Sequence, residues 1–349
     1  MELLTIPLLR RAAQSQPAVA RVHAQVQSVT EKATRDGKPF RELVMGDAEG
    51  KLTLRAWSDS PGFALCAELN QGEFLEIEGE FSTHPAFGLE ARQWSCRPLE
   101  PAEVEALLGG SPEIKEKQER DFETITQLVA SIGDPRLRGV CELFLADLGE
   151  RFRRAAAART YHHARRGGLV EHVAQMMRSA DHVTQVYTTL NRDLLLAGVF
   201  FHDVGKLWEN CPEARGFGIP YDEKGELIGH ITIGVEILNT FWRRLLASEE
   251  AAAWRELHPA SEEVRTHLIH LIVAHHGEVA FGSPIVPKTP EAYALHWIDN
   301  LDAKLEMVFA AYANGLPLTE QITERVRPLP GNLVRPLARF EPPDATPAA

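Results

Sequence analysis

The fold of this 349-residue chain is decided by the stretch Phe201-His202-Asp203-Val204-Gly205-Lys206. Adjacent His and Asp side chains rarely converge on one point unless a ligand binds both, and imidazole and carboxylate are common donors to divalent metals. Further donors that can complete such a set are His172, His230, His275, His276 and Asp299. The pattern therefore predicts a metal centre.

In chain order, these residues resemble the ligands of the HD-domain metal-dependent phosphohydrolases. The resemblance implies an all-α domain with one cation, whose remaining coordination positions are filled by water. The ligands of that cation would be His172, His202, Asp203 and Asp299. A second nearby cation is also implied, with Asp203 as the bridge. Its other ligands would be His230, His275 and His276, although His276 is equally open to a substrate contact.

The predicted ligand set also indicates a reaction class. Two bridged cations generate hydroxide near neutral pH and offset charge on a phosphoryl group, which supports hydrolysis of phosphodiesters by a metal-activated hydroxide. We expect Asp203 and Lys206 to be catalytic, with Lys206 contacting a phosphate oxygen or the hydroxide. Mixed His and carboxylate ligands favour Mn²⁺, Fe²⁺ or a similar ion over Mg²⁺, because Mg²⁺ prefers oxygen ligands. Mn²⁺ is the expected ion, and Fe²⁺, Co²⁺ and Mg²⁺ are alternatives.

Length and composition set wider limits. A chain of 349 residues predicts two domains, and 44% hydrophobic with 25% charged residues is ordinary for a soluble globular protein. The four scattered cysteines, the charge order at the N-terminus and the lack of a long apolar run predict a cytoplasmic protein without membrane contact. The net charge of −12 argues against coating of nucleic acid by bulk electrostatics but leaves room for a local binding groove.

The N-terminal region, residues 15–100, has short segments of alternating hydrophobicity. Five strands are predicted, with turns between them and a short helix between the third and fourth strands. These segments are Val19–Val29, Phe40–Val44, Leu52–Ala56, Phe74–Phe81 and Phe87–Trp94, with the helix at Pro61–Leu69. The order predicts a five-stranded OB-fold β-barrel.

Three motifs add to this prediction. They are Asp36-Gly37-Lys38-Pro39-Phe40, Gly46-Asp47-Ala48-Glu49-Gly50 and Leu54-Arg55-Ala56-Trp57. They resemble nucleic-acid-binding OB domains of the anticodon-binding type, and Trp57 with Arg55 is the predicted substrate contact. A role of the aromatic residues in the core is the alternative. Between Val19 and Arg97 there are nine basic and twelve acidic residues, so this region is not basic.

The rest of the chain has helical periodicity. Residues 101–119 are predicted to be a linker, residues 120–327 an all-α HD domain, and residues 328–349 a tail rich in Pro and Ala. Expected helices are Arg120–Ile132, Asp134–Ala158, Gly168–Thr189, Arg192–Phe201, Gly229–Leu246, Ser261–His275 and Thr289–Ala313.

Two later motifs narrow the resemblance. They are His275-His276-Gly277 followed by Phe281-Gly282-Ser283-Pro284, and Asp299-Asn300-Leu301-Asp302-Ala303-Lys304. Together with the N-terminal strands, they resemble the YhaM family of 3′-5′ exoribonucleases. The resemblance implies Mn²⁺-dependent removal of nucleotides from the 3′ end of single-stranded RNA, with single-stranded DNA as a further substrate, releasing 5′-monophosphates.

Substrate contacts and rival functions stay open at this point. Further predicted contacts are His163, Arg166, Gly282 and Ser283, and for the basic loop of the first two a solvated turn is an equal alternative. A phosphohydrolase of free nucleotides or cyclic dinucleotides is the main alternative function, and a nucleic-acid-binding adaptor with a degenerate metal site is another. Homo-oligomerisation is also left open.

Overall fold

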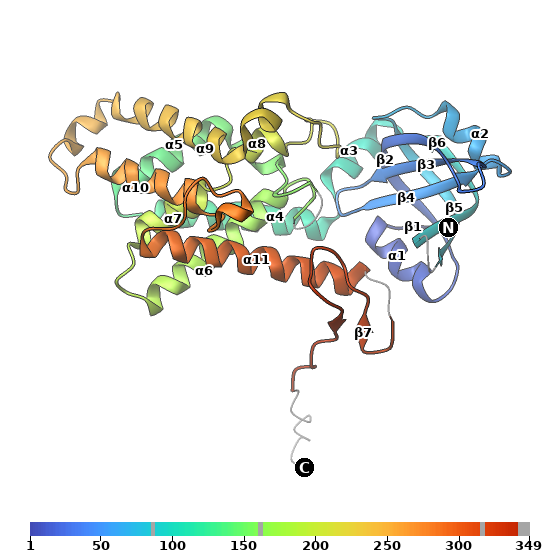
Figure 1. Cartoon of the computed structure of the whole chain (residues 1–349). Coiled ribbons are helices and arrows are strands. Elements are labelled where there is room, and N and C mark those ends of the chain that lie inside the picture. Colours follow the sequence, from blue (N-terminus) through green and yellow to red (C-terminus); the bar gives the residue numbers. More distant parts are fainter. Residues whose placement is uncertain (85–87, 160–162, 315–317, 341–349) are drawn as a thin grey trace, which may run out of the picture. The chain divides into compact units, whose positions relative to one another are not determined.

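The computed structural model describes residues 1–84, 88–159, 163–314 and 318–340. The chain divides into two compact units, Met1–Ala303 and Lys304–Ala349. The first unit begins with a sheet and two short helices (Figure 1). Their bounds are β1 (Glu2–Leu3), α1 (Ile6–Ser15), β2 (Ala18–Ala33), β3 (Pro39–Gly46), β4 (Lys51–Trp57), α2 (Pro61–Glu68), β5 (Phe74–His84) and β6 (Gly88–Pro98).

The sheet is an antiparallel path in the order β4-β3-β2-β5-β6, and β1 pairs in parallel with β2. Strand β4 shows why these segments become strands, because Leu52, Leu54 and Ala56 are buried while the residues between them are not. Ile6 and Leu9 of α1, a helix that the sequence prediction missed, are buried in the core of this sheet. The five predicted strands and the helix between the third and fourth are confirmed.

Closure of the sheet into a barrel is not seen. Within the described residues, β4 and β6 are the two ends of the hydrogen-bonded path and do not pair with each other. A physical reason is visible on β6, where a bulge interrupts the register with β5 and Gln93 has a φ of +48°. A cavity of about 370 Å³ lies between the two edges, lined by residues of both strands.

Helices follow from residue 101 onward (Figure 1). Their bounds are α3 (Pro101–Gly109), α4 (Pro112–Ala130), α5 (Pro135–Arg154), α6 (Gly168–Val186), α7 (Arg192–Phe201), α8 (Lys206–Glu209), α9 (Glu223–Leu246), η1 (Glu250–Trp254), α10 (Ser261–Ala274), η2 (Val279–Phe281) and α11 (Pro290–Asn314). All seven predicted helices are present.

The segment predicted as a linker, residues 101–119, is helical and consists of α3 and the start of α4. A capping box formed by Glu100 and Glu103 begins α3, and the hydroxyl of Ser111 caps α4. Gly110 separates the two helices with a φ of +73°. Gly110 therefore marks a break between two helices within the segment that was predicted to be a linker.

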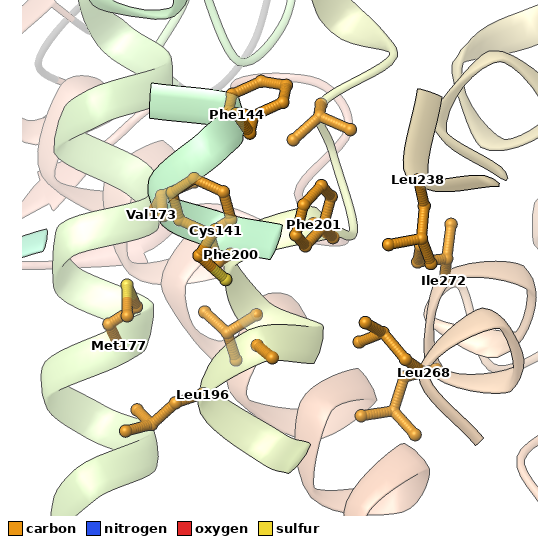
Figure 2. Packing of buried hydrophobic residues seen from close by; sticks show 14 of the residues in the cluster. Cys141, Phe144, Val173, Met177, Leu196, Phe200, Phe201, Leu238, Leu268 and Ile272 are labelled. Carbon is orange, nitrogen blue, oxygen red and sulfur yellow. The ribbon is translucent and has the colours of Figure 1, made fainter. Parts of the chain in front are cut away.

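Helix α7 runs through the apolar core of the helical region (Figure 2). Every residue from Leu194 to Phe201 is buried, which is the property expected of a helix surrounded by other helices. The Phe144 ring lies 5.4 Å from that of Phe200, and a Cβ on Gly198 would lie 2.2 Å from Leu271. This close packing fixes the end of α7, where His202 and Asp203 follow.

The second unit contains a two-stranded antiparallel sheet, β7 (Ile322–Thr323) with β8 (Leu333–Val334). The predicted tail thus includes one strand, and its last nine residues, 341–349, lie outside the described residues. Across the described ranges, no helix is both long enough and apolar enough to cross a membrane.

Asp134 provides a pH test of the helical region. Its carboxylate caps α5 and accepts a 2.7 Å hydrogen bond from the guanidinium of buried Arg136. Burial alone would raise the pKa of Asp134, but the bonds to Arg136 outweigh it and lower the pKa below its ordinary value of 3.8. This interaction therefore stabilises the fold above pH 3.8 and is lost as the pH falls below that value.

We predict that Asp134→Asn lowers the free energy of unfolding by about 1–3 kcal/mol at pH 7, with partial solvent screening favouring the lower end. Urea titrations at pH 7 and at pH 3 measure the effect, and the difference from the wild type should shrink at the lower pH. An equal difference at both values would contradict the role of the carboxylate charge.

Candidate metal centre

The turn after α7 carries the His-Asp pair and depends on Gly205. A Cβ on Gly205 would lie 1.9 Å from the carbonyl oxygen of His230, so only glycine permits this approach of two backbones. Helix α9 is interrupted just before this contact, because Gly229 has a φ of +70° and a ψ of 156°. The two glycines therefore bring His230 next to the turn that carries Asp203.

The first predicted ligand set converges in the structure. His172 comes from α6, His202 and Asp203 from the end of α7, and Asp299 from α11. The Nε2 atom of His172 lies 3.3 Å from that of His202 and 3.4 Å from Oδ1 of Asp299. Oδ2 of Asp203 lies 3.2 Å from Nε2 of His202. Donor atoms of His172, His202 and Asp203 thus lie within 4.8 Å of one another, and Asp299 adjoins this group through His172.

The second predicted set meets the other oxygen of the same carboxylate. Oδ1 of Asp203 lies 3.6 Å from Nε2 of His230 and 3.7 Å from Nε2 of His275. One nitrogen from each of His230, His275 and His276 lies within 4.8 Å of the others. Asp203 therefore directs Oδ2 at one group of predicted ligands and Oδ1 at the other, an arrangement that would allow its carboxylate to hold a cation on each side.

Each of the five imidazoles is oriented through its Nδ1 atom. The acceptors are the carboxylates of Asp302 and Glu209 for His172 and His230, and the carbonyls of Val199, Ile272 and Phe281 for His202, His275 and His276. The distances run from 2.7 to 3.1 Å. An N–H on Nδ1 leaves the Nε2 lone pair for a metal, as in many metal sites.

Unpaired polar atoms test whether the site fits a cation. Among the described residues, three buried atoms in the site lack a hydrogen-bond partner: Oδ1 of Asp203, Nε2 of His230 and Nε2 of His275. Leaving buried polar groups unpaired is costly, and the three are all acceptors when the imidazoles carry their proton on Nδ1. A divalent cation satisfies all three, so the residues present fit a metal.

The protonation states agree with this fit. Burial would raise the pKa of Asp203, but His202, Lys206 and His230 hold it well below its ordinary value. Burial, together with His202 and His276, holds the pKa of His275 well below its ordinary value. An ionised carboxylate and a neutral imidazole are the forms that bind metal.

The pKa of His172 is shifted in the opposite direction to that of His275. Burial would lower its pKa, but hydrogen bonds to Asp299 and Asp302 outweigh burial and raise the pKa to about 9. Without a metal, a proton therefore takes the place between His172 and Asp299. A cation bound there would have to displace that proton, so metal uptake by this set would release protons at neutral pH.

Two carboxylates were missed by sequence reasoning. Asp302 accepts from Nδ1 of His172 at 2.7 Å and lies 3.1 Å from Nε2 of His163, while Glu209 accepts from both the backbone N–H and Nδ1 of His230. Asp302 follows Asp299 by three residues, and Glu209 follows Lys206 by three residues, which is about one helical turn in each case. Such spacing from predicted site residues is the signal that could have identified them.

The other predicted site residues are placed as follows. Lys206 donates to Oδ2 of Asp203 at 2.6 Å, so the two predicted catalytic residues are in contact. His163 is buried against Asp302, and Arg166 donates to the backbone carbonyls of Glu213, Ala214 and Gly216. The hydroxyl of Ser283 donates to the carbonyls of Val273 and Ile285. His163, Arg166 and Ser283 thus each contact other parts of the protein, and their contact with substrate stays a prediction.

Three further residues were predicted to contact the substrate, namely Gly282, Trp57 and Arg55. Gly282 lies at the end of η2 with a φ of +85°, and a Cβ there would be 3.8 Å from Nδ1 of His276. Trp57 and Arg55 lie on β4, in the sheet region, where they line the cavity between β4 and β6. The structure therefore does not bring Trp57 and Arg55 into the metal centre.

Comparison with known proteins gives consistent matches. Residues 169–304 match the HD domain family. The chain is 30% identical over 312 residues to the 3′-5′ exoribonuclease YhaM of Bacillus pumilus (strain SAFR-032), covering 87% of this chain and 90% of that protein. It is 31% identical over 309 residues to the protein of the same name from Bacillus subtilis (strain 168), covering 86% and 89%.

We predict that Gly205→Ala displaces His230, because the added Cβ cannot coexist with its carbonyl oxygen, and that binding of one of two metal ions is lost. Elemental analysis of purified protein measures the ratio of metal to chain. Gly218→Ala is the matched control, since nothing lies within 4 Å of a Cβ at that position. Equal metal content in the two variants would show that the close approach of Gly205 is unimportant.

We also predict that Asp302→Asn weakens Mn²⁺ binding by about 10- to 100-fold, because it removes the charge that orients and polarises His172. Competition against a coloured chelator measures the affinity. Asp36→Asn, in an exposed turn of the sheet region, serves as the control and should bind as the wild type does. An affinity within twofold of the wild type would refute the role of Asp302.

Proposed function

Because the chain belongs to the YhaM family of 3′-5′ exoribonucleases, we propose that it removes nucleotides from the 3′ end of single-stranded RNA and releases 5′-monophosphates. The observation that carries this proposal is the carboxylate of Asp203, whose two oxygens face two separate ligand sets. Such paired sites suit hydrolysis of phosphodiesters by a metal-activated hydroxide.

The residues that would hold the cations are those that converge on Asp203. The first set is His172, His202, Asp203 and Asp299, and the second is His230, His275 and His276 together with Asp203. Divalent cations bound there would acidify a water molecule and offset the negative charge of a phosphodiester. The mixed donor set favours Mn²⁺, Fe²⁺ or Co²⁺ over Mg²⁺.

The protein's own groups orient the reaction. Lys206 keeps its ammonium 2.6 Å from Oδ2 of Asp203, which places positive charge beside the point where a phosphate would arrive. His172 and His202 are fully buried, whereas the side chain of His230 is 14% exposed and that of Asp299 is 20% exposed. The scissile phosphodiester would therefore approach from the side of His230, His276 and Asp299.

Substrate contacts remain proposals. Gly282 follows the His275-His276 pair closely and suits the mouth of the site, where a side chain would narrow the approach. The sheet region, which we assign to the OB type by its strand order, would hold the strand through Trp57 and Arg55. Single-stranded DNA would be a second substrate of the same site, since nothing in the ligand set selects a 2′-hydroxyl.

The cellular setting is proposed on similar grounds. The four cysteines are free, which suits a reducing compartment such as the cytoplasm. Association of the chain into a homo-oligomer stays a prediction that a measurement of molecular mass would test.

We predict that, with Mn²⁺, a 5′-labelled single-stranded RNA shortens from its 3′ end into a ladder of products on a sequencing gel. Asp203→Ala should abolish the ladder, because it removes the ligand shared by both sets, and the activity should fall by at least about 10³-fold. Circular dichroism of the variant confirms that the helices are intact. Asp36→Ala, in an exposed turn, is the control and should cut normally.

The alternative function, hydrolysis of free nucleotides or cyclic dinucleotides, is tested with the same proteins. An intact RNA oligomer alongside Asp203-dependent hydrolysis of a cyclic dinucleotide would replace the exonuclease proposal. Products that shorten from the 5′ end, or internal cuts without a ladder, would contradict the direction of attack.

A further inference from the structure

The cavity between the edges of β4 and β6 has the size and the lining of a ligand-binding site. Its volume of about 370 Å³ lies within the range of small-ligand sites, about 300–1,000 Å³. One tryptophan and one arginine from each edge line it: Trp57 and Arg55 from β4, Trp94 and Arg92 from β6. The two edge strands do not pair with each other, and each contributes one tryptophan and one arginine to the lining of this cavity.

Several features of the backbone serve to position Trp94. The register of β5 with β6 shifts between Glu78 and Glu80, and Gln93 adopts a φ of +48°, which is uncommon for a residue with a side chain. A Cβ on Gly79 would lie 2.8 Å from that of Trp94, and a Cβ on Gly62 would lie 2.9 Å from its ring. The indole therefore fits only because two glycines and a bulge make room for it.

Trp57 is supported from the neighbouring strand. Its ring lies 5.1 Å from that of Phe40, its partner in the register of β3 with β4, with the two planes tilted by 41°. Both tryptophans are only partly buried, so each retains apolar surface toward solvent or the cavity. Aromatic faces held in fixed positions are the usual platforms for unpaired nucleobases, and such stacking tolerates any base.

The charges of the sheet region favour bases over phosphates as the main contact. Arg21, Arg41 and Arg55 each form an ion pair with a glutamate of the sheet, namely Glu76, Glu31 and Glu42. Their positive charge is therefore largely compensated within the protein. Arg92 is exposed at the cavity and is the arginine best suited to a phosphate of a bound strand.

We propose that the cavity between β4 and β6 is a binding site for one nucleobase of a single-stranded RNA, stacked against Trp57 and Trp94, with Arg92 contacting the adjacent phosphate. The proposal rests on the proposed function, because that function makes single-stranded RNA the substrate. It assigns the cavity to retention of the strand and leaves hydrolysis to the metal centre. The nucleobase would then occupy the space that separates β4 from β6.

The test measures binding of a fluorescent RNA decamer by anisotropy, in full-length protein that carries Asp203→Ala so that the RNA stays intact. We expect Trp57→Leu and Arg92→Gln to weaken binding, the former by about 5- to 150-fold. Tyr187→Leu, which removes an exposed aromatic ring at the end of α6, is the matched control and should bind normally. A decamer with abasic sugars should bind weakly to every variant.

Two further measurements separate failure of this proposal from failure of the proposed function. With Asp203 intact, hydrolysis of bis(p-nitrophenyl) phosphate, a diester without bases, measures the metal centre alone, and its loss in Asp203→Ala shows that this centre hydrolyses phosphodiesters whether or not the cavity binds RNA. Binding within twofold of the control in both Trp57→Leu and Arg92→Gln would overturn the nucleobase site, whatever the RNA-cutting activity. If the protein with Asp203 intact does not cut RNA, while Trp57→Leu weakens RNA binding as expected, only the proposed function is overturned.

A cross-linking experiment needs no substitution in the sheet and covers the case in which Trp57→Leu does not fold. RNA containing 4-thiouridine is irradiated in the complex, and the cross-linked peptides are identified by mass spectrometry. Cross-links to peptides of β4 or β6 that contain Trp57 or Trp94 support the site. Cross-links confined to other segments overturn it.

Discussion

A carboxylate with 2% exposure inside a helical core is stable only where positive charge or hydrogen-bond donors lie against it. Asp203 is in this situation, and the ammonium of Lys206 and the imidazoles around it supply part of the compensation. Its second oxygen, Oδ1, has no hydrogen-bond partner among the residues that the structure describes. The energetic deficit of this one atom is what a second cation would remove, so the geometry of the whole site depends on Asp203.

The remaining architecture serves to hold this carboxylate and its neighbours in place. Helix α7 is buried along its length and carries the pair to its end, while Gly205 and Gly229 let two backbones meet there. The carboxylates of Asp302 and Glu209 then fix one imidazole in each ligand set. Each set thus has one histidine held by a charged group, whereas backbone carbonyls hold the others.

Much of this could be predicted from the sequence because ligand identity follows from residue type and order. The stretch from His202 to Lys206 is unusual enough to identify the centre, and seven helices follow from apolar periodicity. Asp302 and Glu209 escaped prediction because a carboxylate on a helix is common and its partner lies far along the chain. The open edge of the sheet was not predicted, because strand order alone indicates a closed barrel. The bulge near Gln93 and the space occupied by Trp94 become apparent only in the folded structure.

The central claim is that one carboxylate joins two cation sites, and diffraction tests it most directly. Crystals grown with Mn²⁺ and measured at its absorption edge would give an anomalous difference map. The account predicts two peaks, one beside His172 and one beside His275, each in contact with a different oxygen of Asp203. A single peak, or two peaks of which one does not contact Asp203, would contradict it.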